Sequence, residues 1–362
     1  AARRHRVARA LASALAEAGC PVTDDLSGAW QEGVGWADLA IAGGQRACSA
    51  SAYLTPALDQ ANLTVETGCL VTGLEIRHGR CTGVRYLRDG TMTRARASGE
   101  VIVCAGAIGS ARLLQLSGIG RADHLRAAGI VAVADVPAVG QHLQDHPAAM
   151  ACYACPGPLP PSGYNHGEVY AALRSQRAGI CPDLHLFPIL LPRAPAGCQP
   201  PAAGYALVAA VTDPDSRGSV RLASADPGQA PLIDPGFLRE RRDLDRLAEG
   251  LDLARQAAAS AAFGAMPAAE VWPGPDQRTP AGLRSYIRHT VASYYHPAGT
   301  CRIGDGSDAV VDTQLRVRGL DGLRVADASV MPAIPNAPLS ATVLAIAEKA
   351  ADLITGQRRA PA

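Results

Sequence analysis

The sequence predicts a mixed fold of the α/β (α+β) class, with strands and helices alternating in one part and an antiparallel sheet in a second part. Two observations support this prediction. The spacing of apolar residues changes from helical to strand-like near residue 62, and the composition shifts to proline-rich segments and alternating strands between about 144 and 282. With 362 residues, of which 48% are hydrophobic, the chain can bury one large core or two moderate ones.

The first elements follow from the period of the apolar residues. Residues 3–18 are predicted to form an amphipathic helix, because apolar residues recur on one face and arginines on the other, and Gly19 and Pro21 end it. Short β-rich runs separated by turn signals then predict a small sheet with hairpin connections, with strands at 63–65, 70–76, 81–87 and 100–104.

The later elements repeat the order of strand, turn and helix. The strand at 100–104 leads through Ala105 and Gly106 into a helix, and such a turn lets backbone approach a ligand closely. A tight packing turn without a ligand is the competing interpretation. Further elements are predicted as strands at 205–211, 218–222 and 323–327 and as helices at 243–261 and 338–354, the last closed by Gly356.

Charge and hydropathy exclude several classes of partner. The formal net charge is +1, from 34 basic and 33 acidic residues, and no basic stripe is present, so we expect no nucleic-acid partner. No apolar run approaches the roughly 20 residues that span a bilayer, so we expect no membrane insertion. Residues 1–9 are basic without an apolar segment behind them, which favours a cytoplasmic location. The expected partner is a small molecule.

The ten cysteines do not indicate a metal site. They are scattered through apolar runs, and we interpret them as reduced and mostly buried. Cys152 and Cys155 have the spacing of half a zinc site, but Cys181 and Cys198 are single, so the second half is missing. We therefore predict no bound metal.

The most informative stretch runs from Tyr294 to Arg302 and is followed by residues 323–329. It indicates a histidine, His296, near a nucleotide cofactor. A neutral imidazole can accept a proton from a bound substrate near neutral pH. The competing interpretation is a histidine that holds a loop by hydrogen bonds. No G-x-G-x-x-G phosphate loop occurs in the sequence.

Five segments together resemble the glucose-methanol-choline (GMC) family of FAD-dependent oxidoreductases. They occur in family order over nearly the whole chain, at 106–120, 139–147, 213–218, 296–302 and 327–332. The resemblance implies an FAD-binding domain of the GMC type, incomplete at its N-terminus, and an antiparallel-sheet substrate domain. The expected ranges are 1–143 for a partial FAD-binding domain, 144–290 for the substrate-binding domain, and 291–362 for the C-terminal part of the FAD-binding domain with the catalytic histidine.

The resemblance also assigns the site residues. His296 matches the family's catalytic histidine, and FAD is the implied cofactor. The segment at Asp327 and Ala328 matches a contact with FAD, and Val71, Ala105 and Gly106 match places where the family's backbone approaches it. Roughly the first third of a family member, with its G-x-G-x-x-G unit, is expected as a preceding or partner segment.

One position departs from the family pattern. Members carry a second His or Asn beside the catalytic histidine, and an ungapped count from Asp327 places Pro338 and Ser340 there. Asn336 resembles the family residue but is displaced by four residues, about one helical turn. We therefore take Asn336 as the second catalytic candidate.

The sequence leaves three functions open. The first is an FAD-linked alcohol dehydrogenase or oxidase, similar to choline dehydrogenases. The second is a hydroxynitrile-type lyase of the same family, which uses the histidine without redox chemistry, and the third is a non-catalytic fragment. The identity of the alcohol and the electron acceptor are not determined by the sequence.

Overall fold

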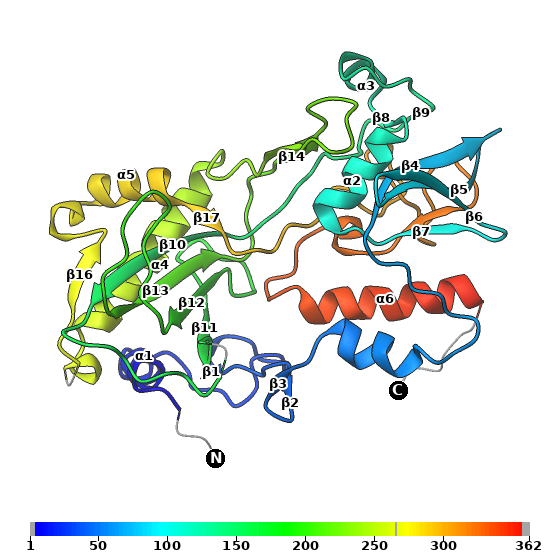
Figure 1. Cartoon of the computed structure of the whole chain (residues 1–362). Helices are drawn as coiled ribbons and strands as arrows, with labels where there is room; N and C mark the ends of the chain where they lie inside the picture. Colours follow the sequence, from blue (N-terminus) through cyan, green and yellow to red (C-terminus); the bar gives the residue numbers. More distant parts are fainter. Residues whose placement is uncertain (1–3, 165, 265, 357–362) are drawn as a thin grey trace. The chain divides into compact units, whose positions relative to one another are not determined.

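The computed structural model describes residues 4–164, 166–264 and 266–356 (Figure 1). The chain divides into two compact units, each assembled from three separate stretches. Unit 1 contains residues 4–39, 146–216 and 237–295, and unit 2 contains residues 40–145, 217–236 and 296–356. These units do not follow the predicted ranges 1–143, 144–290 and 291–362, because residues 4–39 join unit 1 and residues 217–236 leave it.

Unit 1 is built on an antiparallel sheet of seven strands, in the order β1-β11-β12-β13-β10-β16, with β17 also pairing with β10. The strands are β1 Gly33–Trp36, β10 Pro147–Ala154, β11 Val169–Leu173, β12 Leu184–Ile189, β13 Gly204–Val211, β16 Ala269–Trp272 and β17 Ala292–Ser293. The helices are α1 Arg6–Glu17, α4 Arg241–Ala259 and α5 Pro280–Thr290, with the 3₁₀ turns η3 Ala261–Phe263 and η4 Pro275–Gln277.

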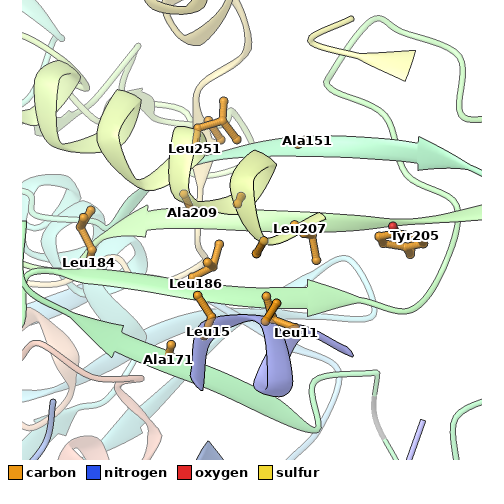
Figure 2. Close-up of a cluster of buried hydrophobic side chains, with 14 of the residues drawn as sticks. Leu11, Leu15, Ala151, Ala171, Leu184, Leu186, Tyr205, Leu207, Ala209 and Leu251 are labelled. Atoms are coloured by element: carbon orange, nitrogen blue, oxygen red, sulfur yellow. The ribbon is translucent and has the colours of Figure 1, made fainter. Parts of the chain in front are cut away.

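The core of unit 1 lies on one face of this sheet (Figure 2). Side chains alternate along β13, so that Leu207 and Ala209 join this core while Val208 points to the opposite face. Leu11 and Leu15 of α1 and Leu251 of α4 pack against the same face. Burial of each such leucine contributes about 1.5–3 kcal/mol to folding.

The first helix confirms the predicted amphipathic period, with α1 at Arg6–Glu17 inside the expected range 3–18. α1 begins after His5, whose ring Nδ1 accepts a hydrogen bond from the amide of Val7 at 3.2 Å. Its apolar face lies on the sheet of unit 1, against β1, which follows it directly, and against β11 and β12, which lie more than 150 residues further along the chain.

Unit 2 contains several small sheets (Figure 1). Three antiparallel strands form one of them, β4 Cys69–Arg77, β5 Arg80–Arg88 and β6 Thr91–Arg96, and a parallel pair is formed by β7 Val101–Val103 and β18 Leu323–Val325. The short pairs are β2 Ile41–Ala42 with β3 Gln45–Arg46, β8 Ile119–Gly120 with β9 Ala134–Asp135, and β14 Ser219–Arg221 with β15 Leu232–Asp234. The helical segments are η1 Ala50–Leu54, η2 Thr55–Ala57, α2 Gly106–Leu116, α3 Ala122–Ala127, η5 Ala328–Val330 and α6 Ser340–Thr355.

The strand predictions in unit 2 are mostly confirmed. The runs at 70–76 and 81–87 form β4 and β5, and 100–104 forms β7. The strand expected at 63–65 is wrong, because these residues have no ladder partner and Val65 is exposed. The run at 100–104 joins residues 323–325 instead of the hairpin sheet, so β7 lies in a parallel pair.

Helix α6 begins two residues later than expected and ends at Gly356, which has a left-handed φ of +69° as predicted. Among the described residues of α6 only Ala350 is fully buried, although the helix is mostly apolar. Leu344, Ala347, Ala351 and Ile354, spaced three and four residues apart, are all exposed. They form an exposed apolar stripe, the α6 stripe. No helix within the described residues is long and apolar enough to cross a membrane.

Candidate active site

The carboxylate of Asp327 joins the turns that follow the two parallel strands. It is 6% exposed, and its Oδ2 accepts hydrogen bonds from the amide of Gly106 at 2.9 Å and the hydroxyl of Ser110 at 2.5 Å. Its Oδ1 accepts from the amide of Ser329 at 2.8 Å and thereby caps η5. The predicted cofactor residue Asp327 therefore ties β18 to β7 and α2, and its carboxylate is engaged by protein donors.

The turn at Ala105 and Gly106 leaves room above its backbone. Gly106 has φ of +75°, and a Cβ built on it would meet nothing within 4 Å. Ala105 is exposed, and its amide donates to Ser110 Oγ at 3.0 Å. Small residues at the carboxyl end of a parallel strand are suited to the close approach of a ligand, so the residues present fit a flavin nucleotide lying over this turn.

The segment that follows His296 runs beside η5. The amide of Gly299 donates to the carbonyl of Ala328 at 3.2 Å, and the amide of Cys301 donates to the carbonyl of Ser329 at 2.8 Å. The hydroxyl of Thr300 donates to the carbonyl of Ala107. Three of the predicted regions, at 105–106, at 296 and at 327–328, are thus brought together within unit 2.

Gln144 holds this segment and the loop before α6 at the same time. Its backbone amide and carbonyl pair with those of Ala298 at 3.0 and 2.9 Å. Its side-chain Oε1 accepts from the amide of Ile334 at 3.2 Å, and its Nε2 donates to the carbonyl of Pro332 at 3.4 Å. Gly299 must be glycine here, because φ is +86° and a Cβ would lie 2.7 Å from Gln144 Nε2.

Burial sets the ionisation of His296. The removal of its imidazole from water lowers its pKa from 6.5 to about 4. The backbone amide of His296 donates to Asp145 Oδ1 at 3.0 Å, which fixes the start of the segment. At neutral pH the imidazole is therefore uncharged, which is the state that a proton acceptor needs.

Asn336 lies in the loop between η5 and α6, four residues before the helix begins. Its side chain is partly buried. Gln144 connects this loop to the segment of His296, since Ile334 is two residues from Asn336 and Ala298 is two residues from His296. The pairing of Asn336 with His296 stays a prediction.

The two remaining predicted cofactor residues, Ala328 and Val71, lie in different parts of unit 2. Ala328 opens η5 beside Gly299, whereas Val71 lies on β4, is 38% exposed and adjoins a β-bulge. Helix α2 packs on β4, so Val71 belongs to the same unit as the other four. Its approach to a cofactor stays a prediction.

Unit 1 brings together aromatic rings that the sequence does not group. Tyr170, His185 and Phe187 lie on the face of the sheet opposite to α1 and α4, at the alternate positions of β11 and β12. Tyr294 stacks on Phe187 with centroids 4.7 Å apart, and its ring meets that of His185 at 6.4 Å. His185 lies 5.1 Å from Tyr170. We call these four side chains the aromatic face.

Sequence reasoning missed Gln144, Asp145 and Ser110. All three lie inside the segments at 106–120 and 139–147 that carry the family resemblance, but their partners are 150 or more residues away along the chain. Only the sheet pairing brings those partners into reach.

The interpretation of the cysteines as mostly buried is wrong, because only Cys81, Cys152 and Cys301 of the ten are buried. Within the described residues no group of three or more His, Cys, Asp or Glu side chains could hold a metal ion.

Comparison with known proteins matches this arrangement to one family. The GMC oxidoreductase family models match residues 2–148 and 214–347. The oxygen-dependent choline dehydrogenase of Chromohalobacter salexigens is 36% identical over 372 residues, and the alignment covers 95% of this chain and 66% of that protein. The mitochondrial choline dehydrogenase of Homo sapiens is 36% identical over 381 residues, covering 98% of this chain and 64% of that protein.

Solved structures agree with the sequence relatives. The pyridoxine 4-oxidase from Mesorbium loti superposes with a TM-score of 0.91 at 34% identity, covering 98% of this chain and 70% of that one. The chain thus spans about two thirds of the length of the curated relatives it matches. The identity to these relatives and the two family matches place the chain in the glucose-methanol-choline family of FAD-dependent oxidoreductases.

Proposed function

We propose that the protein oxidises the CH–OH group of a small alcohol, with His296 as the general base. The observation that carries this proposal is the hydrogen-bonded connection of the His296 segment to the turns at Gly106 and Asp327. An uncharged imidazole is thereby held in the same unit as the turns that suit a nucleotide cofactor. The names of the choline dehydrogenases and the pyridoxine 4-oxidase support an alcohol as substrate.

The proposed role of His296 is to take the hydroxyl proton of the alcohol. Its low pKa, caused by burial, keeps the imidazole uncharged above about pH 4, so the base is ready without prior loss of a proton. Asp145 and Gln144 position it through the backbone at residues 296 and 298. We assign Asn336 to hydrogen-bond the alcohol oxygen beside it, since a neutral amide can donate without competing for the proton.

Ala105, Gly106, Asp327 and Ala328 are the residues proposed to hold FAD, and Val71 is included on the resemblance. The open space over Gly106 supports this assignment. Bound FAD would supply the hydride acceptor. Because the carboxylate of Asp327 is occupied by Gly106, Ser110 and Ser329, we assign it a positioning role toward the cofactor turn.

Within unit 1, the aromatic face is a further proposed ligand-binding surface, supported by the stacking of Tyr294 on Phe187. π-Faces bind flat rings by stacking and cationic methyl groups by cation–π attraction. Pyridoxine and choline, after which the relatives are named, offer one such group each.

The decisive experiment is an anaerobic absorbance spectrum of the FAD-supplemented protein mixed with choline or pyridoxine. Oxidation of the alcohol bleaches the flavin band, and His296→Gln is expected to slow the bleaching about 10²- to 10⁴-fold while FAD stays bound. A flavin band that remains unchanged while a hydroxynitrile is cleaved would instead indicate the hydroxynitrile-type lyase, and absence of bound FAD even with the G-x-G-x-x-G segment supplied would indicate the non-catalytic alternative.

Three further points belong to the same proposal. A segment carrying a G-x-G-x-x-G loop is the proposed partner for the phosphates of FAD, supported by the part of the relatives' length that this chain does not span. A cytoplasmic location is supported by the ten free cysteines, since thiols stay reduced there. The electron acceptor that reoxidises the flavin is left unassigned.

A further inference from the structure

The outer face of the three-stranded sheet in unit 2 is rich in arginine. Along β4 and β5 the alternate residues Leu74 and Val84 pack into the core. The residues between them turn outward, and Arg77, Arg85 and Arg94 are exposed there. This face is separate from the turns at Gly106 and Asp327 that were assigned to FAD.

The register places two like charges directly opposite each other. Arg85 of β5 is the cross-strand partner of Arg94 of β6, an arrangement that destabilises a sheet. Glu75 compensates only one of them, through an ion pair with Arg94 at 3.0 Å. In the described part of the chain, Arg77 and Arg85 have no carboxylate within 4.0 Å. The three arginines and Glu75 therefore leave a formal charge of +2 (three minus one) on this face.

These arginines line a depression of about 420 Å³. Gly73 of β4 is the cross-strand partner of Arg85, and a Cβ built on it would lie 2.7 Å from Arg85 Nη2. The missing side chain thus lets the guanidinium lie across β4. The opposite wall is the loop at 129–133, in which Val131 is 82% exposed and Val133 52% exposed.

We propose that this depression, the arginine pocket, binds a small phosphate ester with a short apolar group. Guanidinium groups present planar donor forks that match phosphate oxygens, and two or three of them together balance a dianion. The valines of the loop would cover the apolar part. The like-charged Arg85–Arg94 pair is then explained, because a bound dianion removes the repulsion that the free sheet carries.

The test is isothermal titration with phenyl phosphate at low ionic strength. The double variant Arg85→Gln/Arg94→Gln is expected to weaken binding at least about tenfold, because two charge-assisted hydrogen-bonding groups are lost. Arg88→Gln is the matched control, since Arg88 lies at the end of the same strand, pairs with Glu66 at 2.5 Å and does not line the pocket; its affinity should stay within about twofold.

Two further measurements test the proposed role of the arginines, one of ligand affinity and one of melting temperature. Arg85→Lys preserves the charge but not the fork, so its affinity should fall between those of the wild type and the double variant. Without ligand, the single variant Arg85→Gln, which keeps the Arg94–Glu75 ion pair, should melt at the same or a higher temperature than the wild type at low salt, because the repulsion is gone. Equal affinities in the wild type and the double variant would overturn the proposal. So would the absence of saturable binding, or binding of an acidic polypeptide such as polyglutamate without phenyl phosphate binding.

Discussion

Replacement of Asp327 by Asn tests the joint between the two parallel strands. The substitution keeps the size of the side chain but replaces one acceptor oxygen by an amide that only donates. If the amide faces Ser329, the cap of η5 is lost; if it faces Gly106, the tie to α2 is lost. The first orientation opposes one donor, the amide of Ser329, and the second opposes two, the amide of Gly106 and the hydroxyl of Ser110.

The magnitude follows from these contacts. A hydrogen bond to a charged group contributes about 1.5–3 kcal/mol, and a buried donor left without an acceptor costs about 1–3 kcal/mol. We therefore expect Asp327→Asn to lower the local free energy of opening by about 2–4 kcal/mol. Asp327→Ala removes the acceptor for three donors and should lower it by about 4–6 kcal/mol. The exposed Asp305→Asn is the control and should change it by less than about 0.5 kcal/mol.

Hydrogen exchange read by mass spectrometry is the suitable assay. All three tryptophans, Trp30, Trp36 and Trp272, belong to unit 1, so tryptophan fluorescence does not report on the joint. Peptides that cover residues 101–116 and 323–332 report on it directly, and they should lose protection together. Unchanged exchange in both peptides of Asp327→Asn, or a loss confined to one of them, would refute the view that this carboxylate holds the two turns together.

Three other outcomes are expected. Because the folded pKa of His296, about 4, is below its unfolded value of 6.5, its contribution to stability is present above pH 6.5 and is lost as the pH falls toward 4. The loss amounts to at most about 3 kcal/mol, and urea titrations at several pH values should find a weaker pH dependence in His296→Gln; equal curves would contradict the assigned burial. Gly299→Ala combines a left-handed φ with atomic overlap and should cost about 2–4 kcal/mol in urea unfolding, whereas Gly319→Ala, with a φ of +77° and open space, should cost only about 1 kcal/mol. Unit 2 carries the exposed α6 stripe, so the chain should self-associate in sedimentation experiments, and Leu344→Gln/Ile354→Gln should shift it toward monomer; an already monomeric wild type would exclude this.

The spacing of apolar residues was enough to predict those helices and strands whose formation depends mainly on the residues within them. The alternation at 70–76 and 81–87 and the helical period at 243–261 correspond to β4, β5 and α4. Leu63-Thr64-Val65 failed because β propensity without a neighbouring strand does not form a ladder. The partner of β7 also escaped prediction, since β18 lies more than 200 residues further along the chain.

Only those residues of the candidate site that lie in recognisable sequence motifs could be predicted from the sequence. His296, Asp327 and Gly106 carry recognisable segments, and the structure joins them within one unit. The aromatic face depends on the register of β11 with β12, so neither Tyr170 nor Phe187 stands out along the sequence. The positioning roles of Gln144 and Asp145 depend on backbone pairing with residues 296 and 298, which no spacing rule encodes.

The discontinuous build of unit 1 has a consequence for synthesis on the ribosome. Leu11 and Leu15 share their core with Leu251, which emerges 240 residues after Leu11. At an elongation rate of about 5–20 residues per second, the apolar face of α1 is made roughly 10–50 s before Leu251 of α4, against which it packs. We expect a chaperone to bind the exposed apolar face of the nascent helix during that time, and the rate of translation between residues 20 and 250 sets how long the face stays exposed.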